Sequence, residues 1–207
     1  MQQLMRYLFR HERKEVRGRF NRERLVLAAM QNADQLYFMM DTQFGGIYQA
    51  DAAERKKEYG ENIIRPSGRN LSMDMMHISY RALLDLVAEL MRQKTAVFRK
   101  GMDLYMEIDS RDIVPGDMVF LSSGDIVPAD VRIIHERQLM VRQHIFTGVD
   151  APVQKYNSLN GCRCSLTSIA DIPDICLMGT SVVGGVAKAV VIGTGSATYF
   201  GKLVYGY

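Results

Sequence analysis

A change of hydrophobic period near residue 95 is the feature that most restricts how this chain can fold. Before it, apolar side chains recur every three or four residues, as Leu83, Val87 and Leu90 do. After it, apolar and polar residues alternate in short segments such as TAVFR, DMVFL and DVRII. Steps of three and four indicate amphipathic helices, whereas alternation indicates strands bounded by turns. The chain is therefore predicted to be an α+β protein, with N-terminal helices packed beside a compact antiparallel β-domain.

Three helices are predicted before the change of period. They cover residues 22–40, residues 50–59 up to Gly60, and residues 76–91 with Ser72 as N-cap. The buried face of the first helix is expected to hold Leu25, Ala29, Leu36 and Met40. The third helix is expected to turn towards the core a stripe of Met76, Tyr80, Leu83, Leu84, Val87, Leu90 and Met91.

Gly, Pro and Asp punctuate the predicted strands. LYMEI is expected to follow TAVFR after a turn at Lys100-Gly101, and SVVGGVAKAVVIG is expected to form two strands joined at Gly184-Gly185. The segment GTGS, residues 193–196, lacks the spacing and the lysine of a phosphate-binding loop, so a strand-end turn is expected there. Four aspartates are interpreted as turn-capping residues rather than as a catalytic carboxylate pair: Asp112, Asp117, Asp125 and Asp130.

Composition and charge argue against several classes of protein. The 207 residues are 47% hydrophobic and 24% charged, as in ordinary globular domains, and a net charge of +3 does not favour nucleic acid as a partner. Three cysteines, two of them Cys162 and Cys164, do not suggest a disulfide framework or a zinc site, and the scattered histidines lack ligand spacing. We expect a reduced, intracellular protein without a membrane span, because no run of about 18 apolar residues is present.

A basic amphipathic segment forms the N-terminus. Leu4, Met5, Leu8 and Phe9 follow helical spacing. The basic side chains around and after them are Arg6, Arg10, Arg13, Lys14, Arg17 and Arg19. Such a segment can lie on an anionic membrane surface, and the alternative is a solvated terminus.

The segment FTGVDAPVQK, residues 146–155, has the form of a functional loop without a functional group. Thr147 and Gly148 suit a tight turn. At its centre stands Val149, whose side chain can neither act as a base nor accept a hydrogen bond. The adjacent Asp150 is displaced by one residue and points its carboxylate elsewhere.

Three stretches of the sequence resemble the actuator domain of P-type cation-transporting ATPases. DIVPGDMVFLSSGDIVPADVRII resembles strands of that domain, and MGTSVVGGVAKAVVIGTGSATYFGKL resembles its closing strands. FTGVDAPVQK falls where the family has its Thr-Gly-Glu loop. Upstream, AERKKEYGENII is similar to the short N-terminal module of the same family. The likeness is nearest to the magnesium-translocating branch and implies a distorted, jelly-roll-like β-domain.

The resemblance covers residues 22 to 203 and suggests how the chain is divided. The four predicted regions are a basic segment (1–20), a helical cation-ATPase module (21–66), a linker with a stalk-like helix (67–94) and the actuator β-domain (95–207). The family places a membrane hairpin after the YGEN module, where this sequence has only the polar joint RPSGRNLSMD. The sequence also contains no Asp-Lys-Thr-Gly phosphorylation motif and no nucleotide-binding domain.

The third departure from the family is Val149, which replaces the glutamate of the loop. In the family that glutamate helps to position the water that hydrolyses an aspartyl-phosphate in another domain. The loop of Thr147, Gly148, Val149 and Asp150 is therefore expected to be catalytically degenerate, unless Asp150 supplies the carboxylate.

The resemblance thus implies an actuator-type domain with a regulatory or fragmentary role, which is not self-sufficient for ATP hydrolysis or transport. No cofactor is expected in this chain, although the family uses ATP and Mg2+. The expected partners are a P-type ATPase phosphorylation domain in trans and an anionic membrane surface, at the cytoplasmic face of the cell membrane. Two alternatives stay open. The chain acts with other domains as a functional cation-transporting ATPase, or its β-domain is a binding scaffold.

Overall fold

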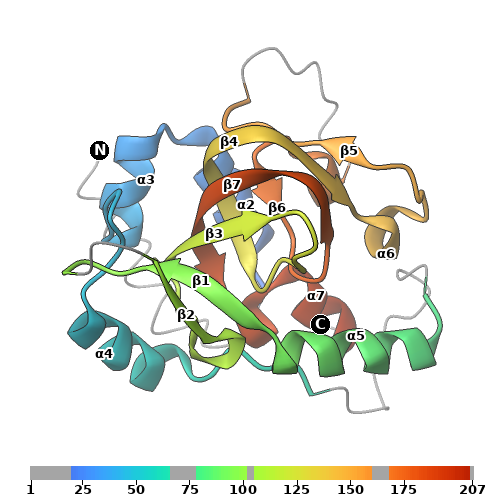
Figure 1. Cartoon of the computed structure of the whole chain (residues 1–207), viewed down its shortest axis with the longest axis horizontal. Coiled ribbons are helices and arrows are strands. Elements are labelled where there is room, and N and C mark those ends of the chain that lie inside the picture. Colours follow the sequence, from blue (N-terminus) through green and yellow to red (C-terminus); the bar gives the residue numbers. More distant parts are fainter. Residues whose placement is uncertain (1–19, 66–77, 102–104, 160–167, 206–207) are drawn as a thin grey trace.

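A computed structural model describes residues 20–65, 78–101, 105–159 and 168–205 of the chain. Within these residues seven strands form one sheet with helices beside it (Figure 1), which confirms the predicted α+β class. The α-helices are α2 (Arg22–Met30), α3 (Ala33–Met40), α4 (Gln49–Tyr59), α5 (Tyr80–Arg92), α6 (His144–Thr147) and α7 (Tyr199–Tyr205). The strands are β1 (Lys94–Phe98), β2 (Met106–Asp109), β3 (Met118–Ser122), β4 (Asp130–Arg142), β5 (Val153–Gln154), β6 (Ile175–Cys176) and β7 (Ser181–Gly193).

The sheet is built around two long strands. Its order is β2-β1-β3-β7-β4-β5, with β6 also paired to β4, and these pairings are antiparallel. The path has two ends, at β2 and β5, so the sheet does not close on itself. Strands β4 and β7 are 13 residues long and pair along most of their length. Strand β4 therefore carries the chain across the sheet to α6 and the FTGVDAPVQK loop.

The prediction of two strands joined at Gly184-Gly185 is wrong, because β7 runs through both glycines as one strand. Gly185 has a φ of 72° and lies opposite a bulge of β4, where Gln138 also has a positive φ, of 51°. Strand β4 pairs with β7 on both sides of this point, and the pairing with β3 begins at Val186. Gly185 adopts a positive φ opposite the bulge in β4, and it does not form a hairpin turn.

Two helix boundaries also differ from the prediction. Residues 22–40 form two helices, since Gln31 is extended and Asn32 starts α3 with a capping box that includes Gln35. Helix α5 begins at Tyr80 with Ser79 as its N-cap, rather than with Ser72, which lies outside the described residues with Met76. The predicted second helix is confirmed as α4, which ends at Gly60.

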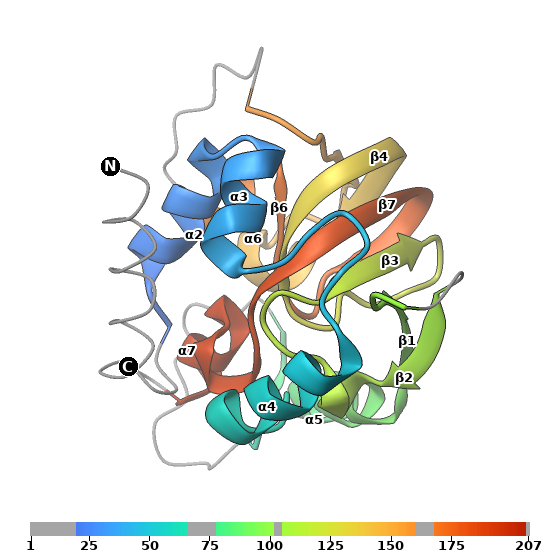
Figure 2. The same cartoon turned by 90° about the vertical axis from the view of Figure 1, so that its left-hand side faces the viewer.

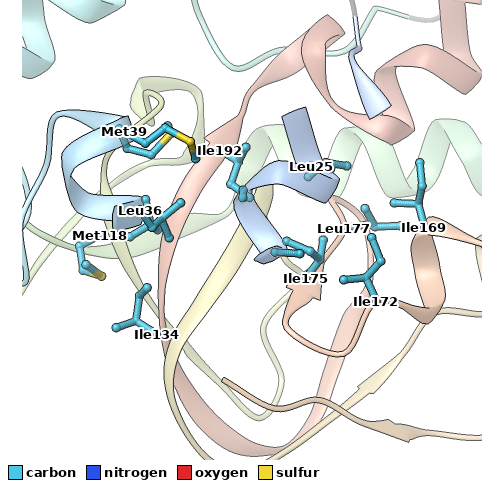
Figure 3. Packing of buried hydrophobic residues seen from close by; sticks show 14 of the residues in the cluster. Leu25, Leu36, Met39, Met118, Ile134, Ile169, Ile172, Ile175, Leu177 and Ile192 are labelled. Carbon is cyan, nitrogen blue, oxygen red and sulfur yellow. The ribbon is translucent and has the colours of Figure 1, made fainter. Parts of the chain in front are cut away.

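Helices α2 and α3 pack against the sheet and share one hydrophobic core with it. Figure 3 shows Leu36 of α3 near Met118 of β3. It shows Leu25 of α2 between Ile192 of β7 and Leu177. The expected buried face of the first predicted helix is confirmed, since Leu25, Ala29, Leu36 and Met40 are all at most 4% exposed. The division into regions at residue 66 stays a prediction, and residues on its two sides share this core.

Helix α5 packs beside α7 in a separate hydrophobic cluster (Figure 2). Leu83 and Leu90 of α5 are fully buried there with Phe200 of α7. The expected stripe is correct for these residues and wrong for Leu84 and Tyr80, which are 40% and 45% exposed. Tyr80 is the first residue of α5. Leu84 follows Leu83 directly, and a helix turns by about 100° per residue, so the two side chains face different ways.

The turn residues around the sheet follow the prediction in part. The segment after β7 forms a strand-end turn, with the 3-10 helix η4 (Gly195–Ala197), as expected. Asp117 and Asp125 accept backbone N–H groups within their own turns. Asp112 instead pairs with Lys56, and Asp130 accepts N–H groups from distant parts of the chain. Turn capping is therefore wrong for these last two aspartates.

Candidate functional site

The loop that carries the Thr-Gly pair is anchored at its entry by Gln143. This residue follows the end of β4 and is only 5% exposed. Its Nε2 donates to the carbonyl oxygen of Ala170 at 3.0 Å. Its own carbonyl accepts the backbone N–H groups of Phe146 and Thr147. These bonds start the short helix α6 at a defined place beside η3 (Ile169–Asp171).

Lys155 anchors the exit of the same loop. Its buried Nζ donates to the carbonyl oxygens of Ala170 at 2.8 Å and of Ile172 at 2.9 Å. Burial lowers the pKa of Lys155, against the opposing effect of Cys176 and two nearby aspartates. Entry and exit thus meet at one carbonyl group, that of Ala170. The loop between Gln143 and Lys155 therefore projects from two ends that are both held by hydrogen bonds.

The Thr-Gly pair shapes the tip of the loop. Gly148 ends α6 in the left-handed conformation with a φ of 70°, and its N–H donates to the carbonyl of His144 at 2.8 Å. The hydroxyl of Thr147 accepts the N–H of Val149 at 3.2 Å. Val149 is consequently presented to solvent, with 57% of its surface exposed. In Figure 1 α6 lies at the side of the sheet opposite α3 and α4.

Asp150 follows Val149 and is held by Arg142. The Nε of Arg142 lies 3.2 Å from the Asp150 carbonyl oxygen and 3.2 Å from its carboxylate Oδ1. Both side chains are accessible, at 45% exposed for Arg142 and 77% for Asp150. The tip therefore presents an apolar side chain, and its nearest carboxylate is already paired with a cation.

A buried group of ionisable residues lies behind the base of the loop. Arg132 approaches Asp174 with 3.0 Å between Nε and Oδ2, and both side chains are almost completely buried. Burial raises the pKa of Asp174 to about 6 and that of the Cys176 thiol to about 11. Arg132 also donates to the carbonyl of Gln31 at 3.0 Å. This group joins the α2–α3 connection to the strands and is not open to solvent.

The other residues considered as sites cannot be placed relative to this loop. The basic residues from Arg6 to Arg19, and Cys162 and Cys164, lie outside the described residues. Within the described ranges, no group of three or more His, Cys, Asp or Glu side chains could hold a metal ion. Over the same ranges, no helix has both the length and the apolar character needed to cross a membrane.

Comparison with known families decides what kind of domain carries this loop. A family model of the P-type ATPase actuator domain matches residues 89–206, which is more than half of the chain. The chain belongs to this family. The matched region of this actuator domain runs from the end of α5 through the whole sheet to α7, and it includes Gln143, Lys155 and the loop between them.

Individual relatives are transport ATPases that are much longer than the matched region. A magnesium-transporting P-type ATPase of Salmonella typhimurium strain 14028s is 37% identical over 59% of this chain and 13% of its own length. Its counterpart in Escherichia coli K12 is 42% identical over 50% of this chain and 11% of its own length. A calcium-transporting ATPase of Bacillus subtilis strain 168 is 36% identical over 58% of this chain and 13% of its own length. The chain thus matches only a small part of each relative.

The sequence alone did not reveal the anchoring of the loop. Gln143 and Lys155 are polar residues that would ordinarily be assigned to the surface, yet both are buried on the carbonyl of Ala170. No sequence motif pointed to Arg142. The only available signal was the alternation along β4, which places Val141 and Gln143 on its buried side and Arg142 on the exposed side.

Proposed function

We propose that this actuator domain docks its Thr147–Asp150 loop onto the phosphorylation domain of a P-type cation-transporting ATPase and does not activate the hydrolytic water. The observation that carries the proposal is the exposed Val149 at the tip of a loop whose two ends are anchored by Gln143 and Lys155. The resemblance to the family places a glutamate at this position. The tight turn of Thr147 and Gly148 supports docking in this proposal, and an isopropyl group would stand where hydrolysis needs a carboxylate.

Asp150 is a poor replacement for that carboxylate in this geometry. Its side chain is turned towards Arg142 at 3.2 Å, and the same guanidinium also holds its backbone carbonyl. A general base must lie within hydrogen-bond reach of the water that it activates. A domain that contacts the phosphoryl group without such a base would retain the phosphorylated state of its partner, which is a regulatory role.

The transported ion proposed for the partner is magnesium. Two of the three relatives described above are magnesium-transporting ATPases, and the third transports calcium. The phosphorylation domain, ATP and Mg2+ would belong to that partner or to other parts of the same pump. The chain would accordingly work at the cytoplasmic face of the membrane.

Decay of the phosphoenzyme of a purified magnesium-transporting ATPase tests this function. The rate should be compared with no added chain, with wild-type chain, with Val149→Glu and with the apolar control Val149→Leu. The pump's own tethered actuator competes at an effective concentration of order millimolar, so the chain is titrated to high concentration. We expect wild type and Val149→Leu to slow the decay, and Val149→Glu to hasten it relative to wild type by about tenfold or more. If all the decay curves coincide although the chain is shown to bind the pump, the loop does not act at the phosphorylation site and only a scaffold role is left.

Binding to an anionic membrane surface is a separate part of the proposal. The basic residues at positions 6, 10, 13, 14, 17 and 19 would each contribute about 1 kcal/mol near such a surface, screened over about 10 Å at 0.1 M salt. In flotation assays the chain should be recovered with anionic vesicles, less so with neutral vesicles, and less at high salt. Equal recovery with both vesicle types, or unchanged recovery after removal of residues 1–20, would reject surface binding.

A further inference from the structure

Arg142 presents an unused hydrogen-bonding edge beside the tip of the loop. It is the last residue of β4, and its side chain is 45% exposed. Its hydrogen bond to the Asp150 carbonyl and its shortest contact with the Asp150 carboxylate both run through Nε. Among the residues that the structure describes, the terminal nitrogens Nη1 and Nη2 have no hydrogen-bond partner. A guanidinium with two free terminal nitrogens can bind the oxygens of a phosphate or carboxylate.

The contact with Asp150 does not neutralise this capacity. Both side chains are solvent-accessible, and ion pairs of that kind are weak because water screens them and both side chains lose entropy. The Arg142 side chain can therefore keep Nε on the Asp150 carbonyl while its outer edge meets another anion. Gly148 and Val149, the exposed residues next in line, carry no side-chain acceptor that would compete for that edge.

The charge around the tip also favours an anion. Lys155 is buried on two carbonyl oxygens, so the exposed part of the loop carries one cation, Arg142, and one carboxylate, Asp150. A glutamate at position 149 would add a second carboxylate there and repel a phosphoryl dianion. Val149 has no carboxylate, so it neither repels a phosphoryl group nor acts as a base.

We infer that Arg142 is the anion-binding residue of this loop and that it holds the phosphoryl group of the docked partner. The identity of the partner rests on the function proposed above. Anion binding by the loop itself depends only on the geometry of Arg142, Val149 and Asp150. Arg142 would bind the phosphoryl oxygens, and Val149 supplies no base to activate water, so the loop would hold the acyl phosphate without promoting its hydrolysis.

Acetyl phosphate, a small acyl phosphate, serves as the probe for the loop alone. Its binding to the full chain is followed by the amide NMR signals of Gly148, Val149 and Asp150, with chloride at matched ionic strength as reference. We expect saturable shifts in the wild type that weaken about tenfold in Arg142→Gln and are partly kept in Arg142→Lys. Arg137→Gln is the matched control, since Arg137 is also exposed on β4 and the substitution removes the same charge.

Equal shifts in wild type and Arg142→Gln, or no saturable shift in the wild type, would overturn the inference. An unaltered amide spectrum elsewhere in Arg142→Gln shows that the fold is intact. The phosphoenzyme assay separates this inference from the proposed function. If wild-type chain binds acetyl phosphate through Arg142 but leaves phosphoenzyme decay unchanged, the function fails and the anion site stands. If wild type and Arg142→Gln slow the decay equally, the function stands and the role of Arg142 is refuted.

Discussion

Asp130 shows how one buried residue can link the stability of this domain to pH. It is the first residue of β4 and is 1% exposed. Its two carboxylate oxygens accept the N–H groups of Met178 at 2.9 Å and Tyr199 at 2.7 Å. Burial raises the pKa of Asp130 to about 7, and these two N–H donors oppose the shift only in part. The folded chain therefore keeps this proton at a pH where the unfolded chain has lost it.

The expected consequence is a fall in the free energy of unfolding as pH rises. A raised folded pKa gives stability that is complete below the unfolded pKa of about 4 and is lost as pH passes the folded value. Asp174, with a folded pKa of about 6, lowers the free energy of unfolding as pH rises to about 6. Asp130, with a folded pKa of about 7, continues this decline to about pH 7. Urea unfolding at pH 5, 6 and 7 measures this decline. Asp130→Asn should flatten it most between pH 6 and pH 7, and an undiminished decline in that variant would contradict the assignment.

At the scale of single elements, α5 offers two leucines with opposite surroundings. Leu90 is fully buried in the cluster with α7, whereas Leu84 on the same helix is 40% exposed. Leu90→Ala should lower the free energy of unfolding by about 2–5 kcal/mol, because it removes buried contacts and leaves a cavity. Leu84→Ala, the matched control, should lower it by less than about 1 kcal/mol. Similar losses at both positions in denaturant titrations would show that the helix packs differently.

A second prediction at the scale of elements concerns the β4–β7 pair. A Cβ added to Gly185, which has a φ of 72°, would meet the carbonyl oxygens of Gln138 and Arg137 across the bulge. Gly185→Ala should therefore destabilise the domain by about 2 kcal/mol or more. In the adjacent Gly184→Ala the added Cβ would lie 3.6 Å from the side chain of Met140, which is an ordinary contact. That control should lose less than about 1 kcal/mol in the same thermal or urea unfolding measurement.

At the scale of the whole molecule, Asn62 ties the segment after α4 to the β-domain. Its side chain is fully buried, donates to the carbonyls of Ser110 and Pro128 at 2.9 Å each, and accepts the N–H of Gly195 at 2.8 Å. One side chain thus joins three segments that are far apart in the sequence. This places the residue Asn62 of the YGEN motif at a junction of the fold.

Loss of this junction should weaken the molecule as a unit. Asn62→Ala leaves buried backbone groups without partners and should lower the free energy of unfolding by about 2–4 kcal/mol. Asn157→Ala is the control, since within the described residues this exposed asparagine makes one long side-chain bond, at 3.4 Å, and its loss should cost less than about 1 kcal/mol. Urea unfolding of both variants decides the matter, and equal stability of Asn62→Ala and wild type would mean that Asn62 is not a structural tie.

Local patterns were enough to predict the class of fold and the place of the loop. The shift from helical spacing to alternation near residue 95 predicted α+β, and the helix that ends at Gly60 was located correctly. The turn chemistry of Thr147 and Gly148 lies within a few residues of sequence. Patterns of this kind are readable because they depend on neighbours along the chain. The part played by Val149 in catalysis stays a prediction.

Contacts between distant residues were decided only by the tertiary structure. Gln143 and Lys155 converge on Ala170, Asn62 joins three segments, and Gly185 faces Gln138 instead of turning. The sequence by itself determined the class of fold, the helix that ends at Gly60 and that the loop carries Val149, because period and turn chemistry are local. Burial and register depend on which surfaces meet. Two polar residues with the same local pattern can therefore end as a buried anchor, as Lys155 does, or as an exposed cation, as Arg142 does.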